Sequence, residues 1–466
     1  MRMRATVTGL ATPLLLAVPP VSPALHAQGG ASVHNQSACT VGRAGASVAS
    51  PCHDGSAVFY NPAALALRPS RVGLGSILLF LDAEFTFDDG RTADFDDQFQ
   101  PVPHLYVSHR TTDRLALAIG AWAPYGLATE WPLSFEGRFV GYDNALRTVY
   151  IQPTAAYQLV PNRLAVGAGV DIVYGDIEIN QRIDLADIAP FGLLGVPEGT
   201  DVADLELEGD DWTATGHLAL AVRPTDRLRL GARYLHTADL DIDDGDATFS
   251  PVALPEAVAS IPLPADNPFG VPAGTPLGAV VPALFEPGGP FADQGVATDL
   301  ELPNQFAVGL AYLAHDRLGL HGEYQWTGWS SFDIAPLAFE ALEPDTLLLL
   351  WDDTHTVRLG AEYSPGSAWT LRGGWSYNDA AEPDIGVSPL LPEARRHQLG
   401  AGAGYRSDGR LRIDAAALWV LQQDRRGRVR PLESREASPA DVNVGVYEAG
   451  ALELGLTVSY RFGPRR

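Results

Sequence analysis

Ala451-Leu-Glu-Leu-Gly-Leu-Thr-Val-Ser-Tyr-Arg-Phe462 alternates apolar and polar side chains without a slip. A period of two places the apolar set and the polar set on opposite faces of a β-strand. Similar alternation recurs through most of the chain, and the chain begins with an export signal. An apolar outer face, a polar inner face and secretion together predict a transmembrane β-barrel in the outer membrane of a Gram-negative bacterium.

Residues 1–27 have the three regions of a secretory signal peptide. Arg2 and Arg4 supply the positive start, residues 10–18 the apolar run, and Ala24-Leu25-His26-Ala27 a cleavage site. The prolines within these residues argue against the alternative, a buried helix. No other segment offers the ~18 apolar residues that a membrane helix needs.

The chain is strongly acidic. Its formal net charge is −25, and all 32 of its Lys and Arg residues are arginine. This charge excludes nucleic acid as a natural partner, because phosphate binding needs a basic face. The acidic residues cluster in residues 82–97, 184–211 and 239–246, which we expect to lie at or beyond strand ends as solvated loops. Divalent cations that bridge these loops to lipopolysaccharide are the alternative.

Two cysteines, Cys39 and Cys52, lie near the mature N-terminus. In an exported protein such a pair usually forms a disulfide, which is what we expect here. The alternative is a metal site with His34 and His53, but that spacing matches no strong zinc pattern. We therefore predict neither a metal nor a cofactor.

Residues 28–70 are rich in Gly, Ala and Ser and lack sustained alternation, which indicates a compact segment without strands. Within it, Asn61-Pro62-Ala63 has the signal of a helix start, with Asn as the N-cap and Pro at the first helical position. A short helix is predicted to follow and to end near Arg68.

From residue 71 to residue 466 the alternation predicts an all-β, antiparallel barrel of about 14 strands, an even number as in bacterial single-chain barrels. The connections alternate between tight turns and long loops, the longest at residues 245–298, and such asymmetry is typical of these barrels. The predicted strands are roughly 71–87, 102–111, 113–131, 146–159, 163–181, 212–223, 227–244, 300–314, 317–334, 353–363, 368–380, 393–406, 410–423 and 448–462.

Four segments in this order resemble the FadL family of outer-membrane transporters of long-chain fatty acids, whose TodX-type members take aromatic hydrocarbons. They are Asn61-Pro62-Ala63, Tyr125–Glu130, Leu302-Pro303 and Trp326–Ser330. The resemblance implies a fourteen-stranded barrel over residues 71–466 and a plug, or hatch, inside it over residues 28–70. It also implies an inward kink of the third strand that opens the barrel wall, at Pro124, Tyr125 and Gly126.

The residues themselves support an interruption at this kink. Pro124 has no amide hydrogen, so it cannot donate a hydrogen bond to a neighbouring strand. Gly126 permits a β-bulge beside it. A broken ladder in a lipid-facing wall leaves unpaired backbone groups that cost several kcal/mol each unless polar groups or water cover them. The interruption therefore requires compensation from inside, which a hatch supplies. The alternative is a simple bulge at the outer rim.

The function predicted is passive transport of hydrophobic molecules, with long-chain fatty acids as the favoured cargo. Apolar residues of the extracellular loops, among them Phe269, Phe285 and Phe291, would hold the cargo by apolar burial before it leaves sideways through the wall. An arginine such as Arg138 or Arg147 would meet the carboxylate of an acidic cargo. The expected partners are outer-membrane lipid, lipopolysaccharide and the barrel-assembly machinery, and the chain is expected to be a monomer.

Four alternatives stay open at this point. They are a channel for aromatic hydrocarbons, a general porin, an outer-membrane enzyme of the lipase type and a purely structural or adhesive barrel. A porin would lack the plug. An enzyme needs a nucleophile and a base, and the sequence contains no Gly-x-Ser-x-Gly elbow, so we assign no catalytic residue.

Overall fold

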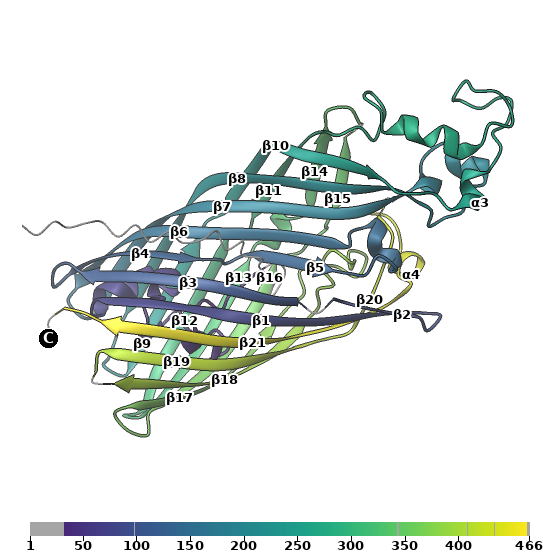
Figure 1. The fold of residues 1–466 in the computed structure, drawn as a ribbon. Coiled ribbons are helices and arrows are strands. Elements are labelled where there is room, and N and C mark those ends of the chain that lie inside the picture. Colours follow the sequence, from purple (N-terminus) through teal and green to yellow (C-terminus); the bar gives the residue numbers. More distant parts are fainter. Residues whose placement is uncertain (1–31, 97, 343, 408, 433, 464–466) are drawn as a thin grey trace, which may run out of the picture.

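The structure is a computed structural model, and it describes residues 32–463 apart from residues 97, 343, 408 and 433. Its strands close into one antiparallel barrel with 14 strand positions in the wall, as predicted (Figure 1). The ring closes where β21 (Gly445–Arg461) pairs with β1 (Arg71–Phe87) along the whole of both strands. No helix of the described residues is long and apolar enough to cross a membrane. The predicted signal peptide lies outside the described residues.

The wall combines unbroken strands with strands that are divided in two. Besides β1 and β21, the unbroken strands are β3 (Gln98–Arg110), β6 (Asp143–Val160), β7 (Leu164–Asp184), β8 (Asp201–Val222), β16 (Thr354–Tyr363), β17 (Trp369–Asn378), β18 (Arg396–Ser407) and β19 (Leu411–Gln422). The divided positions are β4 (Leu115–Trp122) with β5 (Gly126–Glu130), β9 (Leu228–Leu235) with β10 (Ala238–Pro251), β11 (Gln294–Leu302) with β12 (Gln305–His315), and β13 (Leu318–Thr327) with β14 (Ile334–Phe339). The predicted third, seventh, eighth and ninth strands are therefore each interrupted.

The remaining elements are short and lie in the hatch or in the connections. Three short strands, β2 (Thr92–Asp94), β15 (Asp345–Leu348) and β20 (Arg425–Gly427), pair with β1, β14 and β21. The helices are α1 (Ala38–Val41), α2 (Ala57–Tyr60), η1 (Pro62–Leu67), η2 (Glu136–Phe139), η3 (Leu185–Asp187), η4 (Phe191–Leu194), α3 (Glu256–Ala259), η5 (Leu277–Ala279), η6 (Val281–Leu284), η7 (Trp329–Ser331) and α4 (Pro439–Val442).

The two faces of β21 behave as the alternation predicts. Leu456 is 54% exposed on the outer surface, where it faces lipid, whereas Glu453 and Thr457 are fully buried on the inside. The same division holds for large apolar side chains of the other strands, which are exposed although the protein is folded. A barrel in a membrane requires this arrangement, because its solvent on the outside is hydrocarbon.

The prediction that the acidic segments lie at or beyond strand ends is partly wrong. The prediction put residues 184–211 and 239–246 at or beyond strand ends, yet β8 begins at Asp201 and β10 continues to Pro251. The two strands pair with one another through residues 246–251 and 203–208, toward the long-loop end of the barrel. Charges are tolerated on such strand extensions, because their exposed faces contact water and not hydrocarbon.

The described part of the hatch, residues 32–70, lies inside the barrel toward the end with the tight turns and the C-terminus (Figure 1). Its helix α1 packs against β18, β19 and β21, and η1 packs against β6, β7 and β8. At this second contact, Gly167 of β7 leaves no room for a Cβ atom beside the backbone of Pro62 and Ala63. The long loop of residues 252–293 projects from the opposite end (Figure 1).

Asn61 and the two cysteines hold the hatch together. The predicted N-cap side chain of Asn61 makes no capping bond; instead its Nδ2 donates to Val48 O at 2.8 Å and to Leu220 O of the wall at 3.0 Å. Cys39 and Cys52 are joined by a disulfide, with their Cα atoms 6.1 Å apart. Both sulfurs are thus used, and they are not available as thiolate ligands for a metal.

Candidate functional site

The third strand of the wall is interrupted between β4 and β5. Trp122 lies opposite Tyr150 of β6 and Gly126 lies opposite Arg147, so the third strand accommodates one extra residue between these pairs. On its other side, β4 pairs with β3 only from Leu105 to Arg110 of β3. Gly126 itself is the first residue of β5, in extended backbone.

Beyond this interruption the wall loses its ladder on one side. Among the described residues, β5 pairs with β6 alone, and the part of β3 that precedes Leu105 pairs with β1 alone. Strands β3 and β5 are therefore neighbours in the wall without a backbone ladder between them (Figure 1). A wall of this kind has a side opening wherever side chains do not fill the gap.

The hatch supplies hydrogen bonds to the backbone at the interruption. Val33 N donates to Pro124 O at 2.7 Å, and the Gln36 Nε2 amide donates to Ala123 O at 2.6 Å. Ala123 N in turn donates to Gln36 Oε1 at 3.4 Å. Because unpaired backbone groups are costly in a lipid-facing wall, these contacts remove much of the cost of the broken ladder.

Tyr125 completes the compensation and points inward. Its backbone N–H donates to Thr148 Oγ1 at 3.3 Å, and the Thr148 hydroxyl donates to Tyr125 O at 2.6 Å. Its phenol is fully buried, donates to Pro303 O and accepts from Gln305 Nε2 at 2.9 Å. Pro303 lies between β11 and β12, so the interruptions of the third and eighth strands are joined across the lumen by one side chain.

Aromatic rings gather around this link. Trp329 of η7, at the interruption of the ninth strand, packs edge-on against Tyr125 with ring centroids 5.8 Å apart. Trp351 packs against Trp329 at 4.8 Å and against Phe332 at 4.7 Å. The three interruptions therefore face one another across a common aromatic cluster in the lumen.

Three small apolar cavities extend from the gap toward the long-loop end. A cavity of about 70 Å³ lies inside β5, lined among others by Ala128, Leu127 and Leu391. Leu127 and Leu391 also line a second cavity of about 50 Å³, together with Phe332 and Trp351. The second cavity shares residues of β7, β11, β14 and β15 with a third of about 30 Å³.

The third cavity reaches the cluster of apolar residues in the long loop. Val296 and Leu207 line that cavity and also belong to this cluster. The cluster contains the predicted contact residues Phe269, Phe285 and Phe291, and the centroids of Phe285 and Phe291 are 5.4 Å apart. Phe269 stacks instead on Phe191 of η4, with ring centroids 5.3 Å apart. The cluster thus lies at the start of a column of cavities that ends at the gap in the wall.

The column is closed in this structure. A cavity of ~150 Å³ is the size that holds one benzene molecule, and each of the three cavities is smaller than half of that. Side chains such as Leu127 and Leu391 lie between neighbouring cavities and separate them. The arrangement therefore combines an apolar path with a barrier made of side chains.

The two candidate arginines do not reach these cavities. Arg138 in η2 pairs with Asp201 at 2.9 Å. Arg147, whose position in β6 directs it outward, pairs with Asp176 at 2.7 Å and Glu178 at 2.8 Å. The charged residues that do line the second cavity are Glu178, Glu382 and Arg428. Sequence reasoning missed Glu382 and Arg428, because both lie in long connections without a recognisable motif.

Comparisons with known proteins agree with this architecture. A family model described as outer membrane protein transport protein (OMPP1/FadL/TodX) matches residues 22–462. The long-chain fatty acid transport protein of Salmonella typhi is 23% identical over 409 residues, which cover 84% of this chain and 88% of that protein.

Among solved structures, a FadL homologue from Pseudomonas aeruginosa has a TM-score of 0.77 at 20% identity, covering 93% of this chain and 100% of that one. The Pseudomonas putida toluene transporter TodX has a TM-score of 0.65 at 18% identity, covering 94% of this chain and 99% of that one. At these identities, the likeness to solved structures establishes the fold.

Proposed function

Because this chain belongs to the OMPP1/FadL/TodX family of outer membrane proteins, which transport hydrophobic compounds and are not enzymes, we propose that its cargo is long-chain fatty acids. The cargo binds first to the apolar cluster of the long loop and then moves along the three cavities. It leaves sideways between β3 and β5 into the membrane. No energy source is required, because the cargo moves down its concentration gradient.

The observation that carries the proposal is the missing ladder between β3 and β5, next to an apolar cavity. A cargo that enters the membrane here meets side chains and, at the end of β5, the backbone hydrogen bond from Asp96 N to Glu130 O at 3.0 Å, but no ladder. Each methylene group that the path buries contributes ~0.8 kcal/mol, so an acyl chain binds without a specific motif. Because the cavities are closed, the barrel excludes water. Hydrophobic molecules pass only after side chains between the cavities move.

Aromatic hydrocarbons are the second candidate cargo. The aromatic rings of Phe332 and Trp351 line the middle cavity, and flat rings pack well against such walls. The candidate arginines Arg138 and Arg147 are already paired with carboxylates, which weakens the case for either as the anchor of a fatty acid. Likeness to the toluene transporter adds support for this alternative.

The experiment uses two variants that each close the proposed opening between β3 and β5. Pro124→Val with Gly126→Val removes the interruption, and Ala128→Trp fills the cavity inside β5. Uptake of labelled oleate and labelled toluene is measured in cells that lack other transporters of this family. We expect the unaltered protein to take up oleate, with toluene at background, and each variant to lower oleate uptake at least tenfold. If toluene is the cargo instead, the same loss applies to toluene uptake.

The matched control is Ala155→Trp, which adds the same bulk to an exposed position on the outer face of β6. Immunoblots of the outer membrane and the heat-dependent shift in gel mobility establish that each variant forms a barrel. Normal barrel levels with unchanged uptake in both closing variants would reject lateral release. Uptake of toluene but not oleate by the unaltered protein would reject the fatty acid as cargo and leave the opening in place.

A further inference from the structure

A concentration of positive charge lies beneath the hatch of this acidic protein. A cavity of about 240 Å³ opens at the end with the tight turns, which is the periplasmic end of the barrel. Six arginines line it: Arg43, Arg227, Arg229, Arg317, Arg372 and Arg412. Only two carboxylates do so, Asp316 and Glu362, although the chain as a whole carries a net charge of −25.

The carboxylates near this cavity are already engaged. Glu362 accepts from Arg372 Nε at 3.0 Å, and Asp414 behind the cavity pairs with both Arg372 and Arg412 at 2.8 Å. Asp316 lies 3.8 Å from Arg227. Within the described part of the chain, Arg43, Arg229 and Arg317 have no carboxylate within 4.0 Å. These three arginines therefore line the cavity without a direct ion pair among the described residues.

Arg43 is the most unusual of the three. Its side chain belongs to the hatch, is 2% exposed and donates to Ser50 O at 3.2 Å and to Ser47 Oγ at 2.9 Å. Its Nε has no hydrogen-bond partner. A buried guanidinium without a counter-ion is costly, and the cost is removed when an anion binds beside it.

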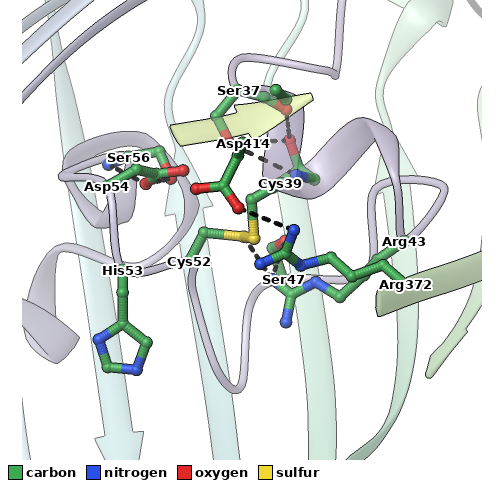
Figure 2. The surroundings of a disulfide bond; sticks show 12 residues. Ser37, Cys39, Arg43, Ser47, Cys52, His53, Asp54, Ser56, Arg372 and Asp414 are labelled. Carbon is green, nitrogen blue, oxygen red and sulfur yellow. Dashed lines mark hydrogen bonds and ion pairs between the residues drawn. A yellow bond between two sulfur atoms is a disulfide. The ribbon is translucent and has the colours of Figure 1, made fainter. Parts of the chain in front are cut away.

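Arg372 reaches the same place from the barrel wall. Figure 2 shows the side chains of Arg43 and Arg372 extending from the hatch and from β17 toward the disulfide, with the Asp414 carboxylate beside the sulfurs. The Nη2 atom of Arg372 has no hydrogen-bond partner, although the side chain is fully buried. Arg43 and Arg372 both line the cavity, and each keeps a buried guanidinium nitrogen without a hydrogen-bond partner among the described residues.

The charges around the hatch also repel one another. Burial lowers the pKa of Arg68 in the hatch well below its usual value, and Arg229, Arg223 and Arg43 lower it further. Asp54 raises this pKa by less than any one of the three arginines lowers it, so at Arg68 the repulsion from neighbouring arginines outweighs the attraction to this acid. The folded hatch therefore carries a cost of electrostatic repulsion that a bound anion removes.

We propose that this cavity is a binding site for a small oxyanion, a carboxylate or a phosphate, which ties the hatch to the barrel wall. The planar guanidinium fork donates two parallel hydrogen bonds to such a group, which chloride does not accept in the same geometry. The cavity holds the charged group with some water. It lies outside the column of apolar cavities, since no residue that lines it lines any of them.

The proposed anion contacts both the hatch and the barrel wall. Arg43 and His53 come from the hatch, whereas Arg229, His321 and Arg372 come from three different strands of the wall. An anion that accepts hydrogen bonds from both sets replaces repulsion by attraction. The hatch is then held more firmly when the anion is bound, and more loosely when the site contains only water.

Binding is tested on the purified full-length protein in detergent at pH 7. Isothermal titration calorimetry uses sodium phosphate, sodium acetate and sodium oleate, each at constant ionic strength set with sodium chloride. We expect phosphate to bind and Arg229→Gln to weaken it at least tenfold. The Arg229 side chain is half-buried, and its one hydrogen bond among the described residues is to Ser50 Oγ, at 2.8 Å, so we expect this variant to keep the fold. Arg114→Gln, at an exposed turn of the same end, is the matched control and binds phosphate normally.

The three anions distinguish the two sources of the group. Competition by acetate and oleate assigns the site to the carboxylate of an acidic cargo, whereas binding of phosphate alone assigns it to a dissolved phosphate group of the periplasm. Absence of binding by all three, or equal binding by Arg229→Gln and the unaltered protein, overturns the proposal. Uptake of cargo is not the readout, so failure here is separate from failure of lateral release.

The effect on the hatch has its own measurement. Hydrogen exchange of the backbone between Arg43 and His53 is followed by mass spectrometry with phosphate and with chloride. We expect at least threefold slower exchange in phosphate for the unaltered protein and for Arg114→Gln, and no difference for Arg229→Gln. Equal exchange of the unaltered protein in the two salts would show that the anion does not tie the hatch to the wall.

Discussion

Replacing Gln36 by leucine should loosen the hatch where it supports the interruption of the third strand. The Gln36 amide donates to Ala123 O at 2.6 Å and to Val33 O at 2.7 Å, and the side chain is fully buried. Leucine has nearly the same volume, so the substitution removes the hydrogen bonds without leaving a large cavity. The perturbation is therefore confined to the polar contacts.

The magnitude follows from the two carbonyl groups that lose their donor. Each buried group left without a partner costs ~1–3 kcal/mol, and water from the lumen lowers this cost where it reaches the carbonyl. The third contact, from Ala123 N to Gln36 Oε1, is long at 3.4 Å and adds little. The local free energy of opening should fall by about 2–5 kcal/mol.

Hydrogen exchange measures this quantity directly. The Val33 amide donates to Pro124 O and is protected only while the hatch is docked. A loss of about 2 kcal/mol speeds exchange about 30-fold, because each 1.4 kcal/mol corresponds to a factor of ten. Peptides that cover residues 32–37 and 120–126 should show the change, while peptides from β17 and β18 should not.

The control is Gln423→Leu, the same substitution at an exposed position outside the hatch. It should leave exchange at the hatch unchanged. The reasoning is refuted if Gln36→Leu folds, as judged by its heat-dependent gel mobility, and yet exchanges at residues 32–37 no faster than the control. In that case, contacts other than those of Gln36 hold the hatch against the wall.

Three further predictions concern single links of the same structure. Tyr125→Phe removes the hydrogen bond to Pro303 O and should lower the free energy of unfolding in urea by ~1–2 kcal/mol; an unchanged value would mean that the two interruptions are not coupled. Replacing Cys39 and Cys52 by serine removes a link across a sequence separation of 13 and should destabilise the hatch by ~3 kcal/mol, measured as faster proteolysis of the hatch with intact strands. Burial and the neighbouring Glu393 raise the pKa of Glu382 in the loop after β17 well above 4.5, so the folded state keeps a proton that the unfolded state releases as the pH rises. Glu382→Gln should therefore raise Tm at pH 8 and leave it unchanged at pH 4; an equal change at both pH values would contradict this.

The sequence predicted the barrel because alternation is a local property. Each residue of β21 faces lipid or lumen according to its own chemistry, so the strand and its faces follow from the period alone. The interruption at Pro124 was predictable for the same reason, since a missing N–H is a property of one residue. Pro303 interrupts the eighth strand by the same rule, although the prediction placed Leu302 and Pro303 at the start of that strand.

The contacts that complete the site were not predictable, because they join residues far apart in the chain. Gln36 meets Ala123 across 87 positions, and Tyr125 meets Pro303 across 178. Neither glutamine nor tyrosine carries a signal for such a partner. The same applies to Arg147, since only the register between β6 and β7 shows that Asp176 lies directly opposite it.

The structure explains how a wall with a gap remains a stable barrel. Strand β6 pairs with β4 as far as Tyr150 and with β5 from Arg147 onward, so the ladder on that side resumes directly after the interruption. At the interruption itself, Thr148 of β6 and the hatch satisfy backbone groups of Ala123, Pro124 and Tyr125 from within. In the proposed lateral release, opening the gap requires movement of side chains such as Leu127 and leaves the ladder between β5 and β6 in place. The cost of opening is then local, and under the proposed passive transport the binding energy of the cargo meets that cost.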